Sequence, residues 1–578
     1  MNILGISCGR DASAAVLRDG VLAAHIIRER LTRRKHDAGI CRATIEEALA
    51  AAKLAPTDID LCAVAIAPYQ TPVCHDPDYF DILDKDSFAP LTGKEAGEDL
   101  RMHLPLQAVL NKRVLSGARV RAHAAHAASS FYCSGFSEAA VLTHDSGPAW
   151  ESGLLFYAEA GKLRPLAPHG LKLAAFYNHI AAICGLGEEG AGKLMGLSAY
   201  GKPVFTQEFL TGDAADLLAE ARRQGYDASL LGKAETLPSP IAADLAASAQ
   251  KFFSDAILEA AKIFLQDLKG QGASPQALCL GGGAALNCPS NSRLWRESGF
   301  DSVFIPPFCD NSGLSVGAAQ WLWHVVYGNP SSGKQASESR CAMTGPDRSV
   351  ETPKALAEFK ASGISSPPSW GERIRVRGDA ESYNQTLNIH PHLKKEEVGG
   401  NAPLRAAQDL AQNKIIGWFE GGSEAGPRAL GHRSILADPR DARNSQRVNA
   451  IKSREIWRPF APVCLLSELH AWFDGPAPSP FMLFTHAVRP DKCALIPAVV
   501  HVDGSARVQT VVPQDIGIYE LLNAFNKLTG IPLLLNTSFN GANEPIVENP
   551  QDVLAFFQKN LLDVLYIDGF RLTLKDRR

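Results

Sequence analysis

The chain has 578 residues, a length that predicts two to four domains and is compatible with two large ones. Apolar residues make up 46%, charged residues 21% and the formal net charge is -4, so neither nucleic acid nor an anionic membrane is expected as a partner. The chain lacks a run of about 18 apolar residues, a secretory start and a C-x-x-C pair among its 12 cysteines, which predicts reduced thiols, no transmembrane helix and a cytoplasmic location.

Residues 1–325 alternate short apolar runs with alanine-rich stretches. The runs AAVLTHD, ALCLGGG and DSVFIPP predict buried strands, and TIEEALAAAKL, ADLAASAQKFFSDAILEAAKIFLQDL and LSVGAAQWLWHVVYG predict amphipathic helices. This alternation predicts an α/β domain with a mostly parallel or mixed sheet. Residues 326–400 are rich in Gly, Ser, Pro and charge, which predicts a linker or peripheral segment. The helix APLRAAQDLAQNK and the strand IIGWFEG then begin a second α/β domain over 401–578.

Three turns that follow predicted strands in the first domain are rich in small residues. In chain order they carry Arg10 and Asp11, then Asp145, then Gly281, Gly282 and Gly283. Small residues let backbone N–H groups approach a phosphate, and an aspartate there can hold a cation. A single turn of this kind is weak evidence. Three in this order resemble the phosphate and adenosine loops of the actin-like ATPase and sugar-kinase superfamily.

Two histidines suggest a metal site in the same domain. His123 and His126 lie three residues apart in a stretch predicted to be helical, which places both on one face. Asp145 and Asp310 each follow a predicted strand, and imidazole together with carboxylate suits a first-row divalent metal. His144 is a reserve ligand only, because consecutive strand residues point to opposite faces.

The second domain concentrates cations among glycines, prolines and strand ends. They lie in WFEGGSEAGPRALGHRSILADPRD, IKSREIWRPFAP and HVDGSARVQTV, and LLLNTSFNGANEPIV adds amides and hydroxyls. Guanidinium groups match phosphate oxygens with two parallel hydrogen bonds, so these motifs predict a site for a ligand with several phosphates. The predicted anion-binding residues are Arg428, Arg433, Lys452, Arg458, Arg507, Asn536, Ser538 and Asn540.

These motifs resemble the O-carbamoyltransferase family of antibiotic and nodulation-factor biosynthesis. The first domain carries H-A-A-S-x-F, G-K-x-M-G-L-x-x-Y-G, G-G-x-A-L-N and D-x-S-G-x-S-x-G-A-A. The second carries G-P-R-A-L-G-x-R-S-I-L-A-D-P-R, R-P-F-A-P, H-V-D-G-x-A-R-x-Q-T-V and L-N-T-S-F-N-x-x-x-E-P-I-V. The resemblance covers most of the chain outside 326–400. It implies an actin-like first domain, similar to the threonylcarbamoyl-transfer proteins that modify tRNA, and a second domain similar to threonylcarbamoyl-adenylate synthases.

The resemblance also implies a chemistry. The second domain would make carbamoyl adenylate from carbamoyl phosphate and ATP with Mg(II), and the first would transfer the carbamoyl group to a hydroxyl of a small-molecule natural product. The implied ligands of an iron(II)-type metal are His123, His126, Asp145 and Asp310. The implied contacts of carbamoyl adenylate in the first domain are Lys193, Gly281, Gly282, Gly283 and Asn287. The candidate catalytic residues for transfer are Asp11, Lys35, Arg10 and His36.

Two departures from the family pattern affect the transfer site. The family has histidines where Arg10 and Ala122 stand. Arginine stays protonated and cannot act as a base, so Asp11 or His36 would replace it, unless the acceptor is an amine. An enzyme that delivers carbamoyl adenylate to an amine or a partner protein is therefore an alternative, as is a nucleotide-binding partner subunit. The acceptor is left open, residues 67–110 being expected to vary with it, and so is the oligomeric state, a homodimer included.

Overall fold

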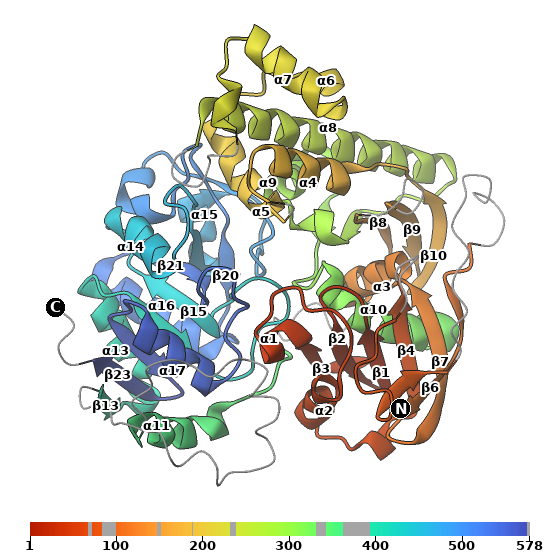
Figure 1. Ribbon diagram of the computed structural model, residues 1–578, viewed down its shortest axis with the longest axis horizontal. Helices are drawn as coiled ribbons and strands as arrows, with labels where there is room; N and C mark the ends of the chain where they lie inside the picture. Colours follow the sequence, from red (N-terminus) through yellow and green to blue (C-terminus); the bar gives the residue numbers. More distant parts are fainter. Residues whose placement is uncertain are drawn as a thin grey trace.

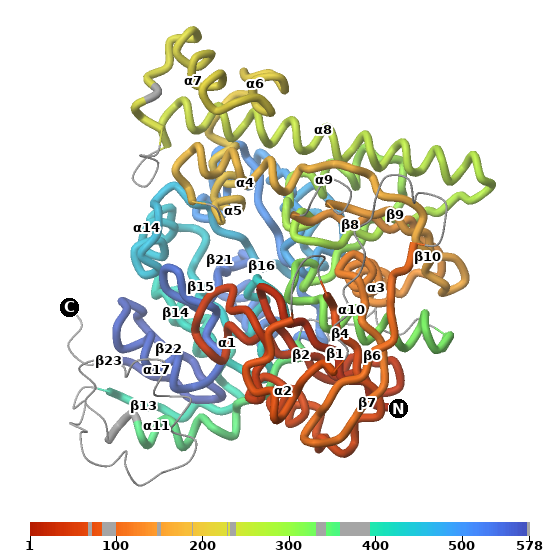
Figure 2. The backbone as a smooth tube through the Cα atoms, turned by 45° about the vertical axis from the view of Figure 1, so that its right-hand side comes forward, coloured from red at the N-terminus to blue at the C-terminus, as the bar shows by residue number. Residues whose placement is uncertain are grey.

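The computed structural model describes residues 1–66, 72–83, 100–146, 152–187, 189–231, 238–330, 343–361 and 393–574. Figure 1 shows the second domain, in cyan to blue, beside the first, which runs from red to green. The long helix α8 (Pro240–Gly270) lies across the top in both Figure 1 and Figure 2. Among the described helices, none combines the length and apolar character needed to cross a bilayer.

The first sheet orders its strands β3-β2-β1-β4-β7-β6-β5. Their bounds are β1 Asn2–Ser7, β2 Ser13–Arg18, β3 Val21–Ile27, β4 Leu61–Ile66, β5 Phe80–Ile82, β6 His103–Leu110 and β7 Arg113–Arg121. Strands β1, β2 and β3 form an antiparallel meander, whereas β4 and β7 add in parallel to β1. Strand β1 is central and buried along almost its whole length, which fits its apolar run NILGIS.

The second sheet repeats this order as β10-β9-β8-β11-β12. Its bounds are β8 Ala139–His144, β9 Gly153–Glu159, β10 Lys162–Pro168, β11 Ala277–Gly281 and β12 Ser302–Phe304. It again joins an antiparallel meander to two parallel strands. Helix α10 (Leu314–Gln320) packs on the first sheet and α3 (Ala122–Ser134) on the second, and the two helices pack on each other. This duplicated order is the predicted actin-like arrangement, and the α/β class is confirmed.

The second domain is built on an eight-stranded mixed sheet ordered β13-β23-β22-β14-β15-β21-β16-β20. The strands are β13 Leu393–Glu397, β14 Ile416–Phe419, β15 Arg433–Ala437, β16 Ala461–Leu465, β20 Gln509–Val511, β21 Leu533–Ser538, β22 Val564–Ile567 and β23 Phe570–Leu574. The helices that bear on the argument below are α13 Ala402–Ala411, α14 Arg443–Ile451, α16 Ile516–Thr529 and α17 Pro550–Lys559. A second, short sheet has the strand order β17-β18-β19, with the bounds Phe473–Asp474, His486–Val488 and Ser505–Ala506. These strands come between β16 and β20 in the chain.

Parts of the segment predicted as a linker or peripheral segment pack against both domains. Strand β13 pairs with β23 and so extends the sheet of the second domain. Helix α11 (Thr352–Ala361) packs on α17. Arg348 Nη2 lies 2.9 Å from a carboxylate oxygen of Glu47 in the first domain, and both side chains are buried. The runs in this segment are short and polar, so hydrophobic periodicity could not predict these contacts.

Hydrogen bonds join the described residues of the two domains in three regions. Arg33, just after α1 (Arg28–Thr32), donates to the carbonyls of Ile546 and Pro545 at 2.5 and 2.8 Å. On another side, the Tyr200 hydroxyl donates to the Trp457 carbonyl at 2.9 Å.

The third region joins α9 (Cys288–Glu297) to the second domain. There the Asn291 side chain donates to the Leu483 carbonyl at 2.9 Å. A space between the domains lies among these three regions.

We expect the buried carboxylate of Asp409 to anchor α13 to the sheet. It accepts hydrogen bonds from Arg571 (2.7 Å), Lys414 (2.7 Å) and Tyr566 (2.6 Å). Burial opposes its ionisation, but these three donors outweigh burial and lower the pKa of Asp409 to about 2. Asp409→Asn should therefore lower the free energy of unfolding at pH 7 by about 2 kcal/mol.

The pH dependence of this difference follows from the depressed pKa. The contribution of Asp409 is present above its unfolded pKa of about 3.9 and is lost as the pH falls towards 2. Urea unfolding should show a constant gap between wild type and Asp409→Asn from pH 7 to about pH 5, and a shrinking gap below about pH 4. A gap that widens on acidification would contradict this assignment.

Candidate active site

The space between the domains is one cavity of about 1320 Å³. This exceeds the usual size of a single small-molecule pocket, about 300–1,000 Å³. The first domain lines it with Asp11, Glu29, Lys35, His36, Glu189, Lys193 and Asp310. The second domain lines it with Arg428, Lys452, Arg454, Arg458, Arg507, Asn536, Ser538 and Asn540. Predicted transfer residues and predicted anion-binding residues therefore line one cavity.

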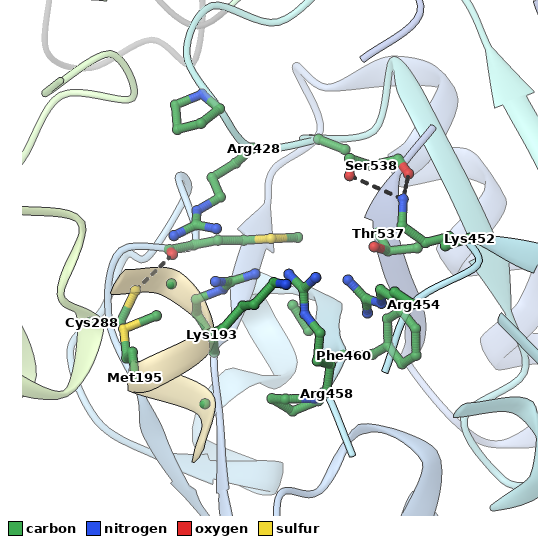
Figure 3. Close-up of a pocket in the computed structure, with 18 of the residues that line it drawn as sticks. Lys193, Met195, Cys288, Arg428, Lys452, Arg454, Arg458, Phe460, Thr537 and Ser538 are labelled. Atoms are coloured by element: carbon green, nitrogen blue, oxygen red, sulfur yellow. Dashed lines mark hydrogen bonds between the residues drawn. The ribbon is translucent and has the colours of Figure 1, made fainter. Parts of the chain in front are cut away.

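The second-domain side of the cavity is a cation cluster, formed by Arg428, Lys452, Arg454, Arg458 and Arg507, with Lys193 facing it from the first domain. Figure 3 shows Lys193, Arg428, Arg454 and Arg458 directing their nitrogen-bearing ends into one space. Burial, followed by repulsion from Arg428, lowers the pKa of Arg507 to about 10.

Burial, followed by repulsion from Arg458 and Arg507, also lowers the pKa of Arg454 well below its usual value. The cluster is thus a concentration of positive charge that an anionic ligand would stabilise.

One acid contacts the cation cluster directly. Glu455 lies 2.7 Å from Lys193 Nζ and 3.5 Å from Arg458 Nη1, so it bridges the two domains. Its pKa is lowered because the hydrogen bond from Lys193 and the charge of Arg458 outweigh the effect of burial. Among the described residues, Glu455 is the carboxylate that pairs with these cations, and the guanidinium groups that it leaves without an acidic partner favour an anionic ligand.

Lys452, at the end of α14, fixes the turn that follows β21. Its Nζ donates to Asn540 Oδ1 (2.7 Å), to the Asn540 carbonyl (2.9 Å) and to Ser538 Oγ (3.2 Å). Burial, together with the charges of Arg454 and Arg458, lowers the pKa of Lys452 well below its usual value. The Ser538 hydroxyl and the Asn540 amide are thereby held at the cavity wall beside the cation cluster.

The first-domain side of the cavity centres on His36. Its Nδ1 lies 2.7 Å from Asp11 Oδ1 and its Nε2 lies 2.7 Å from a carboxylate oxygen of Glu189. Both Asp11 and His36 adopt positive φ values, 59° and 57°, and Glu29 accepts the His36 backbone N–H at 2.8 Å. Burial disfavours the imidazolium, but the hydrogen bond and charge of Asp11 outweigh burial and raise the pKa of His36. The side chain of Arg10 pairs with Glu189 at the edge of this group.

The four predicted metal ligands divide between two places. His126 Nε2 lies 3.2 Å from Asp145 Oδ2, beside the glycines 281–283. His123 instead lies with its Nδ1 2.9 Å from Thr143 Oγ1, although its ring centroid is 6.2 Å from that of His126. Asp310 lines the cavity near Asp11, which together with burial raises the pKa of Asp310 to about 6.

The fit of a metal to these residues is therefore incomplete. Within the described residues, the group of three ligand atoms lying within 4.8 Å of one another comprises Asp11, Glu29 and His36, and not the predicted four. His144, the reserve ligand, stacks on His169 with ring centroids 5.1 Å apart, and its Nε2 accepts the backbone N–H of Ala174 at 3.2 Å. The His₂Asp₂ set does not fit a metal in this arrangement, so no step is routed through one.

Two further predicted residues do not line the cavity. Arg433 is fully buried, donates to the Glu420 and Gly421 carbonyls and stacks on the Phe419 ring at 3.7 Å. Asn287 caps α9 through Ser290 N–H, 3.2 Å away, and bonds with Gln250. These contacts give Arg433 and Asn287 structural positions in this fold. The motif glycine Gly147 lies outside the described residues.

Several site residues escape sequence reasoning. Glu189 precedes the G-K-x-M-G motif and carries no pattern of its own, so its contact with His36 could not be foreseen. Glu29 sits inside RERLTRRKHD, where it is a lone acid before a basic run. Glu455 is likewise the lone acid among the cations of IKSREIWRP, and that isolation was a usable signal of a bridging role.

Comparison with protein families matches two sequence models. The model described as "Carbamoyltransferase N-terminus" matches residues 2–320, and the one described as "Carbamoyltransferase C-terminus" matches residues 407–573. An uncharacterized protein, sll1178, of Synechocystis sp. is 31% identical over 99% of this chain and 96% of its own length. Nodulation protein NolNO of Sinorhizobium fredii is 32% identical over 97% of this chain and 78% of its own. Nodulation protein NolO of Bradyrhizobium diazoefficiens is 32% identical over 78% of each.

Solved structures match more weakly. Full-length HypF in a phosphate- and nucleotide-bound form is 14% identical, with a TM-score of 0.29, and covers 56% of this chain and 46% of its own. The archaeal actin homologue Ta0583 is 12% identical, with a TM-score of 0.24, over 55% of this chain and 98% of its own. With scores this low, the fold assignment stands on the strand order of the two sheets.

The depressed pKa of Lys452 predicts proton uptake when an anion binds. An anion in the cation cluster offsets the repulsion from Arg454 and Arg458, so it raises the pKa of Lys452 towards its usual value. Titration calorimetry with pyrophosphate, repeated over a series of pH values from neutral to alkaline, should show a heat that depends on the ionisation enthalpy of the buffer, with protons entering the complex over part of that range. Lys452→Met should abolish the uptake while Arg440→Ala, outside the cavity, retains it; a buffer-independent heat in the wild type would contradict the assignment.

Proposed function

The chain belongs to the carbamoyltransferase family, and we propose that it is an ATP-dependent O-carbamoyltransferase acting on a small-molecule acceptor. The observation that supports this most is the single cavity shared by the cation cluster and the Asp11–His36 pair. In the proposed first step, water cleaves carbamoyl phosphate to carbamate and phosphate. A carbamate oxygen then attacks the α-phosphorus of ATP, pyrophosphate leaves, and carbamoyl adenylate remains.

The cation cluster suits this first step. Carbamate and ATP are both anions, and their approach is opposed by repulsion that buried guanidinium groups offset. Charge also develops on the pyrophosphate leaving group, where Arg428 and Arg507 could accept it; the Nε atoms of both have no hydrogen-bond partner among the described residues. ATP with Mg(II) is proposed as the nucleotide, and an iron(II)-type metal stays a proposal that anaerobic metal analysis decides.

The shared cavity suits the second step, in which the carbamoyl group is transferred to the acceptor. Carbamoyl adenylate is prone to hydrolysis, so a shared volume that connects both sites limits its exposure to bulk water. We assign the base for transfer to the Asp11–His36 pair, since Asp11 orients the imidazole at 2.7 Å and raises its pKa. Glu189 would have to release His36 Nε2, which it contacts at 2.7 Å; the acceptor hydroxyl then gives its proton to that nitrogen, its oxygen bonds to the carbamoyl carbon, and AMP leaves. Arg10 is occupied by Glu189 and is left out of this proton transfer.

Two alternatives differ in what they predict. An amine acceptor would need no base, so the transfer rate would follow the ionisation of the amine and not that of His36. A nucleotide-binding partner subunit without catalysis would not need the cation cluster, whose buried like charges cost stability. The presence of that cluster favours the enzyme.

Adenylation predicts that purified protein releases pyrophosphate from ATP only when carbamoyl phosphate is present. Ser538→Glu should abolish the release, because it places a negative charge where anions bind. Arg428→Ala or Arg507→Ala should cost about 2–4 kcal/mol of transition-state stabilisation, measured as kcat/KM for pyrophosphate release.

A matched control lies in the same motif as Arg428. Arg440 is held by Asp438 at 2.6 Å outside the cavity, so Arg440→Ala should change kcat/KM little. Pyrophosphate release that ignores carbamoyl phosphate would sink the proposed first step.

Transfer predicts a different set of sensitive residues. His36→Gln and Asp11→Asn should each reduce transfer while leaving carbamoyl-phosphate-dependent pyrophosphate release within a few-fold of wild type. Arg10→Ala should weaken transfer but also spare pyrophosphate release, because the residue acts only through Glu189 and the edge of the site. Since the base must be neutral, transfer should rise with pH through the raised pKa of His36.

The measurement is of both half-reactions on each variant, with candidate polyols and amines as acceptors and labelled carbamoyl phosphate as donor. Equal losses in both half-reactions would place Asp11 and His36 in folding or nucleotide binding. A pH profile unchanged in His36→Gln would remove the assignment of the base.

A further inference from the structure

Glu424 is a buried carboxylate beside the cation cluster but outside the cavity. Its side chain is fully inaccessible to solvent, and none of its atoms lines the cavity. Its Oε1 accepts three backbone hydrogen bonds, from the N–H groups of Leu430 (2.9 Å), His432 (2.9 Å) and Arg433 (2.8 Å). One oxygen therefore holds the backbone that directly follows Arg428 in place through three hydrogen bonds.

The same loop is held from its other end. Gly426 has a φ of +86°, and a Cβ there would meet the Pro307 carbonyl of the first domain at 2.1 Å. The Gly426 carbonyl accepts a hydrogen bond from Arg30 Nη2 at 2.8 Å. Arg428 thus projects from a short loop that is fixed by Glu424 on one side and by the first domain on the other.

Arg30 connects the two anchors. Its Nη1 lies 4.0 Å from Glu424 Oε2 and 3.8 Å from Glu548 Oε2, and all three side chains are almost completely buried. Burial opposes the ionisation of Glu424, but Arg30, His432 and Arg433 outweigh it and hold the pKa of its carboxyl below the usual value. Part of the charge that stabilises the Glu424 carboxylate is therefore supplied by the first domain, through Arg30.

We propose that Glu424 is a positioning residue that sets Arg428 for anion binding, and that Arg30 makes this position depend on the docked first domain. The proposal rests on the proposed function only for the identity of the anion. Its mechanism is the geometry of the 424–433 loop: if Oε1 loses its charge or its place, the three N–H groups relax and the Arg428 guanidinium leaves its position in the cavity.

A double-mutant cycle on the full chain tests this, with pyrophosphate binding by calorimetry as the readout. Glu424→Gln keeps an acceptor oxygen for the N–H groups and removes the charge. We expect it to raise the Kd for pyrophosphate about three- to tenfold in the wild-type background but less than about twofold in Arg428→Ala, because its effect passes through Arg428. Arg30→Met should behave in the same way and serves if Glu424→Gln does not fold.

The matched control is Asp409→Asn, another buried carboxylate of the second domain with several donors, 2.6–2.7 Å away at their nearest, but remote from the cavity lining. It should lower the unfolding midpoint and leave the Kd unchanged. A purely structural role for Glu424 would give additive effects with Arg428→Ala, or an unchanged Kd, and either result would overturn the proposal. Wild-type protein that binds pyrophosphate but never releases it from ATP would sink the adenylation chemistry while leaving the cycle intact.

Discussion

The mutual repulsion of buried cations is the constraint around which the site is organised. Lys452, Arg454, Arg458 and Arg507 share one cavity, and burial and repulsion depress the pKa values of all four. Left alone, such a cluster would splay into solvent, because the interaction of like charges grows as the local dielectric falls. The chain counters this with specific contacts: Lys452, at the end of α14, is hydrogen-bonded to the turn after β21, and Arg458 pairs with Glu455.

The residues packed behind the cations reduce the free-energy cost of this repulsion. Arg433 and Glu424 form a neutralising layer behind the cations, and their hydrogen bonds go to backbone groups and not to solvent. This explains why an arginine in the same motif as Arg428 does not reach the cavity: one faces the ligand space and the other supports it. Motif membership therefore identifies a region of the fold, whereas burial and partner choice identify the role of each side chain.

The sequence predicted the α/β class, most of the quoted helices and strands, and several of the charged residues that line the cavity. These succeeded because apolar periodicity and strand-end motifs are local signals. It did not predict the pairing of His36 with Asp11 and Glu189, since those residues are far apart in the chain and meet only through the packing of β1, α1 and α5 (Ala191–Leu197). The duplicated sheet order was implied only by the family resemblance, because the two sheets share topology without sharing a sequence repeat.

The contacts between the domains are made largely by side chains of one domain on backbone carbonyls of the other, as with Arg33 on Ile546, Tyr200 on Trp457 and Asn291 on Leu483. A carbonyl acceptor is present whatever residue carries it. Divergence of the accepting loops therefore leaves the interface chemically intact so long as the backbone path is kept. Halves from distantly related members of the family should therefore remain able to dock, so that the residues lining the cavity in one half can diverge while the other half is retained.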